Sequence, residues 1–268
     1  MPMPIKSNGS NDRRVCLVGV GIQPKLHISR QAIDAIVGSS FIVHFSDPQL
    51  TEILDDLRVG QREELDDLYI DGATDDDNYG SILRRIVELV EMHGSVAFVS
   101  QGNPRLGVSL VDMLDAASVE NSFTLEVLPG ISSFETLIID AECDPLERGS
   151  VLVDANRWLL YRHKPNVEMD YFIYHVCSVA TRSTNYSDAS IGNHIHLLQA
   201  SLLESYPADH PCKLIQSSGA GVGSAEVREV TVGSLVDSLC HITFATTLYV
   251  PSSTAPELDE SVLRLMLS

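Results

Sequence analysis

The stretch RVCLVGVG, residues 14–21, is a continuous apolar run that ends on two glycines separated by a valine. Apolar side chains at successive positions are typical of a strand buried on both faces of a parallel sheet. Three later segments also predict strands, namely FIVHF at 41–45, SVAFVS at 95–100 and FTLEVL at 123–128. A buried strand near the start of the chain, with further strands to pair beside it, indicates an α/β sheet.

Segments with helical periodicity lie between these strands. They predict helices at 27–40, 51–57, 78–94 and 107–117. The segment 78–94 is the clearest, because an apolar stripe runs from Ile82 to Val90 and Gly94 ends it. Strands that alternate with helices predict an open, mostly parallel sheet.

The pattern changes after Gly130. Helices are expected at 134–142 and 194–206, and strands at 149–153, 171–177, 212–216, 225–230 and 246–250. This half is richer in strands and predicts a mixed sheet with fewer helices. We therefore expect a disordered tail at 1–13, an N-terminal α/β domain at 14–128 and a C-terminal α/β domain at 129–268.

The composition excludes several classes of protein. The chain has 268 residues, and 37 Asp and Glu oppose 18 Lys and Arg, for a net charge of −19. Phosphate backbones and anionic membrane surfaces would be repelled, so we expect no nucleic-acid and no membrane partner. The five cysteines form no CxxC pair and no cluster has zinc-ligand spacing, which favours a cytoplasmic location and no metal.

Three loops follow predicted strands, where ligands gather in open α/β sheets. GVGIQP at 19–24 lacks the third glycine of a dinucleotide fingerprint and predicts a tight turn. SQGNPRLG at 100–107 is a stiff bend that either only turns the chain or exposes backbone groups to a ligand. PGISS at 129–133 offers two serine hydroxyls, either as a helix cap or as the edge of a small-molecule pocket.

These three loops, in this order and at these spacings, resemble the tetrapyrrole (corrin/porphyrin) methylase family, and YPADHPCKLIQSSG at 206–219 adds to the likeness. The resemblance runs from Arg14 to about Val250. It implies a class III S-adenosylmethionine (SAM) methyltransferase, with two α/β domains, the cofactor in the cleft between them and S-adenosylhomocysteine as product. It also implies a homodimer.

Within that superfamily the chain is most similar to the peptide backbone N-methyltransferases of borosin biosynthesis. The similar segments are LYIDGATDDDNY at 68–79, DAECDPLERGSVLVDANRWL at 140–159 and YFIYHVC at 171–177. The resemblance implies two catalytic tyrosines, Tyr69 and Tyr79. The cofactor-binding residues that it implies are Gln101, Gly102, Asn103, Pro104, Leu106, Ser132, Ser133, Tyr174, His175 and Ser218.

The chain departs from the borosin pattern at four positions. Asp75 stands where the borosin enzymes carry an arginine, and Gln101 stands where they carry a tyrosine. Asn103 replaces the histidine of their Gly-His-Pro loop, and His175 replaces a glutamine. The acidic run at 75–77 would favour a cationic or amine acceptor, or raise the pKa of a neighbouring tyrosine. His175 could serve either as a lining residue or as a base.

We therefore expect a SAM-dependent methyltransferase that N-methylates a peptide, with the precursor peptide on a separate chain as one arrangement. One alternative is a methyltransferase that acts on a small molecule or a tetrapyrrole-like acceptor. The other alternative is a SAM-binding scaffold subunit that has lost catalysis. Tight binding of SAM without turnover would distinguish the last from the first two.

Overall fold

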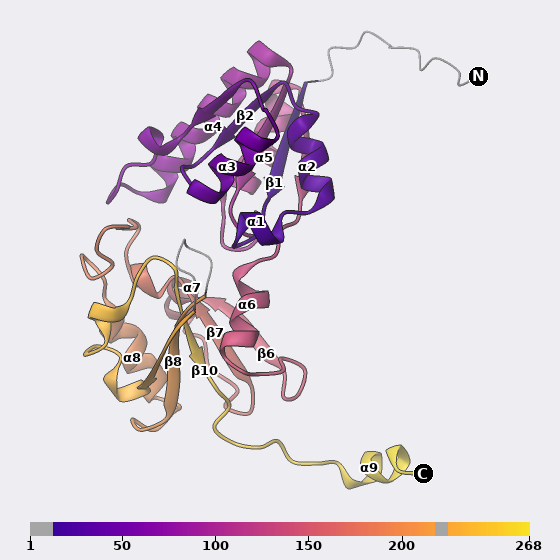
Figure 1. Cartoon of the computed structure of the whole chain (residues 1–268). Coiled ribbons are helices and arrows are strands. Elements are labelled where there is room, and N and C mark those ends of the chain that lie inside the picture. The colour runs from indigo at the N-terminus through magenta and orange to yellow at the C-terminus, as the bar shows by residue number, and fades with distance from the viewer. Residues whose placement is uncertain (1–12, 218–224) are drawn as a thin grey trace. The chain divides into compact units, whose positions relative to one another are not determined.

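The computed structural model describes residues 13–217 and 225–268, which divide into two compact units (Figure 1). Unit 1 contains the described residues up to Ile70 and then Asp75–Ser133. Unit 2 contains Asp71–Thr74 and Phe134–Ser268. The chain therefore leaves unit 1 for a short segment, 71–74, and returns to it.

Unit 1 is built on a sheet whose strands are all parallel, as the sequence predicts. The strand order is β3-β2-β4-β1-β5, with β1 at Arg14–Gly19, β2 at Phe41–His44, β3 at Arg62–Glu64, β4 at Ser95–Ser100 and β5 at Thr124–Leu128. Its helices are α1 at Pro24–His27, α2 at Arg30–Val37, α3 at Pro48–Asp56, α4 at Asp75–His93 and α5 at Leu110–Asn121, with a 3₁₀ turn at Asp66–Leu68. Because the strands are parallel, their carboxyl ends lie at one edge of the sheet.

The continuous apolar run in β1 is explained by two separate cores. Val15 and Leu17 pack in one cluster with residues of α4 and α5, whereas Cys16 and Val18 pack in another with residues of α2 and α3. Successive side chains of a strand point to opposite faces, so both sets must be apolar. Each fully buried aliphatic side chain contributes about 2 kcal/mol to this packing.

Unit 2 has the mixed sheet that the sequence predicts. The order is β6-β7-β10-β8-β9, with β6 at Ser150–Asp154, β7 at Asp170–Tyr174, β8 at Pro211–Gln216, β9 at Glu226–Thr231 and β10 at Thr246–Val250. β6 and β7 are parallel and the other pairings are antiparallel. The helices are α6 at Ser133–Asp140, α7 at Ala155–Leu160, α8 at Ile195–Leu203 and α9 at Glu260–Met266, with 3₁₀ turns at Val176–Ser178, Val232–Ser234 and Leu239–His241.

The core of unit 2 is centred on Trp158 of α7, which is fully buried. Its indole N–H donates to the Ser201 hydroxyl at 3.0 Å, so the polar end of the ring has a partner. Its ring lies edge-on to Tyr171 at 5.4 Å. These contacts fix α7 against α8 and β7.

Several elements differ from the sequence prediction. The strand predicted at 171–177 ends at Tyr174, because His175 has a φ of 57° and starts a 3₁₀ turn at Val176. The helix predicted at 107–117 begins at Leu110 and continues to Asn121. The acidic run at 75–77 forms the first turn of α4, where carboxylates stabilise the helix dipole.

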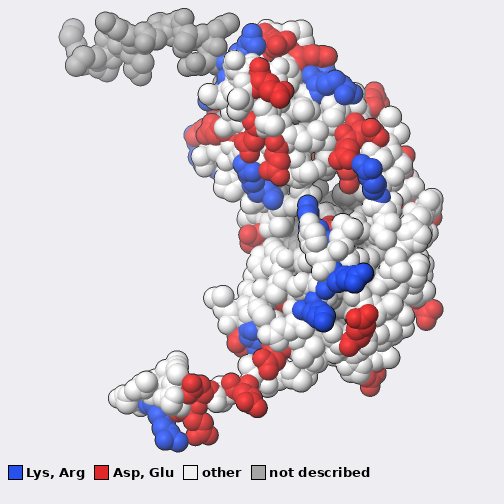
Figure 2. Space-filling view, turned by 180° about the vertical axis from the view of Figure 1, so that it is seen from behind, with Lys and Arg blue, Asp and Glu red and all other residues white. Residues whose placement is uncertain are grey.

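Basic groups on the surface lie beside acidic ones (Figure 2). Arg85 of α4 bonds both Glu63, at 2.7 Å, and Glu88, at 2.9 Å. The hydrogen bond from Arg85 holds the pKa of the Glu63 carboxyl below its usual value. Arg62 likewise pairs with Asp55 at 2.6 Å. These arginines are therefore engaged within the protein.

Two kinds of feature are absent from the described residues. Within 13–217 and 225–268, no helix is both long enough and apolar enough to cross a bilayer. Over the same ranges, no three His, Cys, Asp or Glu side chains are grouped so that they could hold a metal ion.

Candidate functional site

The carboxyl ends of β1, β4 and β5 meet at three glycines, Gly19, Gly102 and Gly130, which we call the glycine junction. A Cβ atom on Gly130 would lie 2.3 Å from the Gly102 carbonyl oxygen and 2.7 Å from the Gly19 carbonyl carbon. A Cβ atom on Gly19 would lie 2.6 Å from the Gly130 nitrogen. The three backbones therefore touch directly, and glycine stands at position 130 because no side chain fits there.

Backbone hydrogen bonds tie two of these loops together. The Gly102 N–H donates to the Gly21 carbonyl at 2.9 Å, and the Gly21 N–H donates to the Gly102 carbonyl at 3.3 Å. Gly102 has a φ of 70°, in the left-handed region that glycine adopts without strain. The loop after β4 is thus hydrogen-bonded to the loop that follows β1.

Side chains of the loop at 100–107 form further hydrogen bonds and ion pairs. The Gln101 amide donates to the Ile22 carbonyl at 3.0 Å, and the Asn103 side-chain oxygen accepts from the Arg105 N–H at 3.0 Å. Arg105 forms ion pairs with Asp112, at 3.4 Å, and Asp115, at 3.1 Å. The loop therefore presents neutral polar groups together with a cation that two carboxylates already balance.

The structure brings the predicted cofactor residues of unit 1 to one place. Gln101, Gly102, Asn103, Pro104 and Leu106 lie on the loop after β4. Ser132 lies just past Gly130, with only 5 % of its surface exposed, and Ser133 is the first residue of α6. The glycine junction joins the two groups.

The two predicted catalytic tyrosines also lie together in unit 1. The ring centroids of Tyr69 and Tyr79 are 6.2 Å apart, edge to face. The Tyr69 hydroxyl donates to the Asp75 carboxylate at 3.0 Å. The side chain of Asn78 bonds both the N–H and the C=O of Ile70, at 3.0 and 3.1 Å. These bonds fix the residues on either side of the segment 71–74.

The segment 71–74 itself is held by hydrogen bonds to residues 184–187 of unit 2. The Asp71 carboxylate accepts from the backbone N–H of Tyr186 at 2.6 Å, and from the N–H and hydroxyl of Ser187. The Ser187 hydroxyl, followed by the backbone N–H groups, holds the pKa of Asp71 below its usual value. Gly72 donates to the Thr184 carbonyl at 3.1 Å.

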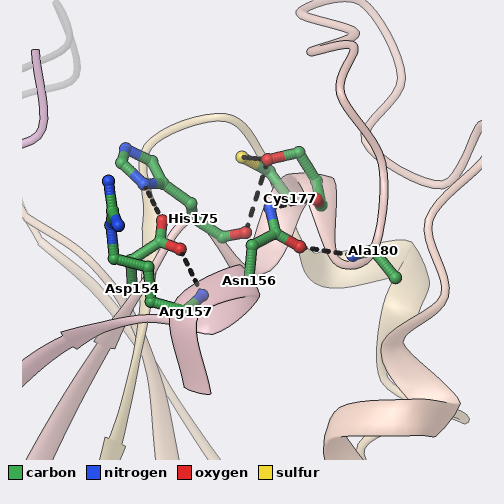
Figure 3. Close-up of polar contacts among 7 residues, drawn as sticks. Asp154, Asn156, Arg157, His175, Cys177 and Ala180 are labelled. Atoms are coloured by element: carbon green, nitrogen blue, oxygen red, sulfur yellow. Dashed lines mark hydrogen bonds and ion pairs between the residues drawn. The ribbon is translucent and has the colours of Figure 1, made fainter. Parts of the chain in front are cut away.

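A second set of polar residues lies in unit 2, at the carboxyl ends of the parallel strands β6 and β7 (Figure 3). His175 Nδ1 bonds Asp154 Oδ2 at 2.6 Å. The other carboxylate oxygen of Asp154 accepts from the Arg157 N–H at 2.8 Å and so caps α7. Burial raises the pKa of Asp154, but the bonds from His175 and the backbone N–H groups outweigh it, so the net shift is downward.

Asn156 holds the chain that follows β7. Its amide donates to the Ser178 carbonyl at 3.0 Å, and its side-chain oxygen accepts from the Ala180 N–H at 2.5 Å (Figure 3). His175 and Ala180 have φ values of 57° and 55°, which are uncommon for residues other than glycine. The segment 175–180 therefore has a defined, strained conformation that the Asn156 side chain maintains.

Two of the predicted cofactor residues, Tyr174 and His175, lie at this end of β7, and Ser218 lies outside the described residues. Asp154 and Asn156 lie in the borosin-like run at 140–159, and the sequence alone assigns them no role. The sequence feature that would have indicated them as site residues is a polar side chain directly after a predicted strand, at the cap of a short helix.

Comparison with known proteins places the chain among methyltransferases. The family model of the Tetrapyrrole (Corrin/Porphyrin) Methylases matches residues 14–164, more than half of the chain. In fold, the chain is similar to a cobalt precorrin-4 methyltransferase of cobalamin biosynthesis, with a TM-score of 0.62 and 12% identity, over 92% of this chain and 98% of that one. It is also similar to the uroporphyrin-III-C-methyltransferase from Thermus thermophilus, with a TM-score of 0.60 and 17% identity, over the same shares.

Curated relatives match along nearly the whole chain. The methyltransferase/ribosomally synthesized cyclic peptide dendrothelin A precursor of Dendrothele bispora is 21% identical over 93% of this chain and 60% of its own length. The methyltransferase/ribosomally synthesized type II borosin cyclic peptide precursor of Phlebiopsis gigantea is 22% identical over 94% of this chain and 45% of its own length. The chain thus spans about half the length of the curated relatives that it matches. These findings confirm the resemblance and the fold class, and the chain belongs to the tetrapyrrole (corrin/porphyrin) methylase family.

Proposed function

We propose that the chain is a SAM-dependent methyltransferase that N-methylates a peptide. The observation that carries this proposal is the glycine junction, which gathers the loops after β1, β4 and β5 at the edge where α/β proteins bind ligands. The names of the curated relatives join a methyltransferase to a peptide precursor, and their similarity covers more than nine-tenths of this chain. A peptide is therefore the acceptor that the comparisons favour.

The residues around the glycine junction fit SAM by their chemistry. Gln101, Asn103 and Ser132 supply neutral hydrogen-bonding groups, as the hydroxyl and amino groups of a nucleoside require. The cation of the loop, Arg105, is held by two aspartates, so this loop is not arranged for a phosphate-bearing cofactor. The bound group would supply a methyl carbon made electrophilic by its sulfonium, and the chain's net charge of −19 favours a cationic ligand.

The tyrosine pair is proposed to orient the acceptor. Methyl transfer needs the nucleophile within about 3–3.5 Å of the methyl carbon and in line with the bond that breaks. A phenol can hydrogen-bond the acceptor as charge develops on it. Tyr69 and Tyr79 lie edge to face, and the bond from Tyr69 to Asp75 fixes the direction of one hydroxyl.

That same bond favours a second candidate, an amine acceptor on a small molecule or a peptide. Asp75 brings a carboxylate to the tyrosine where the borosin pattern has an arginine. A carboxylate would attract a protonated amine and would destabilise an imidate-like oxygen. The two candidates therefore differ in the charge of the group that is methylated.

One assay separates these functions. The chain is incubated with SAM carrying a labelled methyl group and a synthetic peptide of the precursor region of the dendrothelin A protein, either free or with its amines acetylated. Methylation of both forms, located by tandem mass spectrometry on backbone nitrogens, supports the proposal. Methylation of the free form alone supports the amine candidate, and SAM binding without transfer to either form, or to a uroporphyrin III-type acceptor, favours a scaffold.

A further inference from the structure

The loop that follows β2 supports the segment that carries Tyr69, and both belong to unit 1. The carbonyl of His44, the last residue of β2, accepts from the Leu65 N–H at 2.9 Å, just after β3 ends. The 3₁₀ turn at Asp66–Leu68 follows, and the Asp66 carbonyl accepts from the Tyr69 N–H at 3.0 Å. A short run of backbone hydrogen bonds therefore leads from the sheet to Tyr69.

A side-chain clamp fixes this turn to the loop after β2. The Asp66 carboxylate accepts from both the backbone N–H and the hydroxyl of Ser46, at 2.9 and 2.8 Å. The same hydroxyl lies 3.3 Å from a carboxylate oxygen of Glu64, the last residue of β3. Hydrogen bonds to an ionised group are about twice as strong as neutral ones, so Ser46 and Asp66 hold the main chain of Tyr69 in place.

The ring of Phe45, in the same loop, contacts the ring of Tyr69. The two centroids are 6.2 Å apart with the planes at 80°, and Phe45 meets Phe98 of β4 at 6.1 Å and 67°. Both are edge-to-face contacts, an arrangement that aromatic pairs favour. Phe98 is only 2% exposed, so the Phe45 ring rests on a side chain that the close-packed core holds still.

The backbone of Phe45 is restrained as well. His44 is fully buried, and its Nδ1 lies 2.9 Å from the Phe45 carbonyl oxygen. A carbonyl oxygen can only accept a hydrogen bond, so Nδ1 carries the proton and donates it. Phe45 is therefore held at its main chain by His44 and at its ring by Phe98, and it presents a fixed surface to Tyr69.

These contacts restrict the direction of the Tyr69 hydroxyl. A tyrosine side chain has only two torsions, so a ring that is held leaves its hydroxyl little choice of position. The Tyr69 ring meets Phe45 and Tyr79, each at 6.2 Å, and its hydroxyl donates to Asp75 at 3.0 Å. Phe98 lies in β4, which leads into the loop at 100–107, so the aromatic contacts join Tyr69 to the strand that ends at the glycine junction.

We propose that Phe45 is a positioning residue that holds the phenol of Tyr69 toward the acceptor. This inference rests on the proposed function, in which the Tyr69 hydroxyl bonds the acceptor as charge develops on it. Phe45 has no polar side-chain group, so it acts only through Tyr69. A misplacement of about 1 Å can cost about 10²-fold in rate, so loss of the Phe45 ring should slow transfer without changing the affinity for SAM.

Phe45→Leu tests the proposal, and Phe41→Leu is its matched control. Phe41 is the first residue of β2, packs against the same core cluster as Phe45 and stacks on His93 at 4.4 Å. Each substitution removes a partly buried ring from this cluster, and Phe45→Leu also removes the edge-to-face contact with Tyr69. With the dendrothelin-derived peptide, Phe45→Leu should lower kcat about 10- to 100-fold with SAM affinity unchanged, while Phe41→Leu should keep the wild-type rate.

A double-mutant cycle separates positioning from a general loss of packing. If Phe45 acts through Tyr69, the double variant Phe45→Leu/Tyr69→Phe should transfer no more slowly than Tyr69→Phe, because the hydroxyl that Phe45 holds is already gone. If Phe45 only supports the fold, Phe45→Leu should lower the rate by the same factor in both backgrounds. That second result would overturn the proposal.

A spectroscopic measurement gives a readout that does not depend on turnover. In the full chain with ¹³C-labelled tyrosine rings, the NMR signal of Tyr69 is identified as the one lost in Tyr69→Phe. Phe45→Leu should move this signal, because a neighbouring ring is removed, and Phe41→Leu should leave it in place. Wild-type protein that binds SAM but transfers no methyl group overturns the proposed function. An unmoved Tyr69 signal in Phe45→Leu, or a rate equal to that of Phe41→Leu, overturns the role of Phe45 alone.

Discussion

Replacing Gly130 with alanine should disrupt the glycine junction from within. The added Cβ would lie 2.3 Å from the Gly102 carbonyl oxygen, whereas real Cβ contacts are essentially never closer than 3.0 Å. The carbonyl would have to move by at least the difference, 0.7 Å. The contacts at 2.7 Å with Gly19 and Gly21 are also to backbone, so no side-chain rotation can relieve the clash.

The magnitude follows from two terms. Overpacking a close-packed site costs about 1–3 kcal/mol, and rigid backbone on every side places this site near the upper end. Moving the Gly102 carbonyl also weakens its bond from the Gly21 N–H, worth about 1 kcal/mol. We therefore expect a loss of about 3–4 kcal/mol, or a fall in Tm of about 6–16 °C.

Thermal unfolding by circular dichroism, with and without SAM, measures this change. Two glycines serve as matched controls, because a Cβ on Gly60 meets nothing within 4 Å and one on Gly80 of α4 meets only the end of Arg84 at 3.8 Å. Alanine at these positions should be neutral or stabilising by about 0.5–1 kcal/mol. A Gly130→Ala protein that melts with the two controls would refute the direct backbone contact.

Four further predictions concern the loop at 100–107, the tyrosines, Asp154 and assembly. Gly102→Val should weaken SAM binding at least tenfold in calorimetry, because valine is strained by about 1–2 kcal/mol at a left-handed φ; unchanged affinity would contradict this. Tyr69→Phe and Tyr79→Phe should each leave SAM affinity intact and lower the transfer rate about 10²-fold, and equal rates would remove the tyrosines from the reaction. Because the pKa of Asp154 is lower in the folded state, its carboxylate stabilises the fold at pH values above the unfolded-state pKa of about 3.9, and this stability is lost as the pH falls through the folded-state pKa. At pH 7 the wild type should therefore have a larger free energy of unfolding in urea than Asp154→Asn. This difference should close in acid, and a difference independent of pH would contradict the prediction. Light scattering at high salt should give twice the chain mass of 29.3 kDa, and the single-chain mass would contradict a homodimer.

Much of the fold could be predicted from hydrophobic periodicity. The run at 14–21 predicts a strand buried on both faces because its odd and even residues are both apolar, and the two clusters on either side of β1 confirm this. The elements that periodicity missed are short or charged. β3 lies in a charged stretch at Arg62–Glu64, and α7 spans only Ala155–Leu160, too short for a helical pattern to emerge.

The site was harder to predict because it depends on contacts between distant loops. The sequence shows a turn at each of Gly19, Gly102 and Gly130, but not that a Cβ on one would strike the backbone of another. The bond between Asp154 and His175 joins the ends of two strands, and it requires a left-handed residue where the sequence predicts a continuing strand. Only the register of β6 with β7 brings these side chains within reach of each other.

The most direct test of the proposed function is calorimetric titration of the purified chain with S-adenosylhomocysteine. We expect saturable binding with a Kd in the micromolar range or tighter, about −8 kcal/mol. Gly60→Ala should bind as the wild type does, while Gly102→Val should bind at least tenfold more weakly. A wild-type chain that gives no heat and no thermal shift with this ligand or with SAM would contradict the proposal that it is a SAM-dependent methyltransferase.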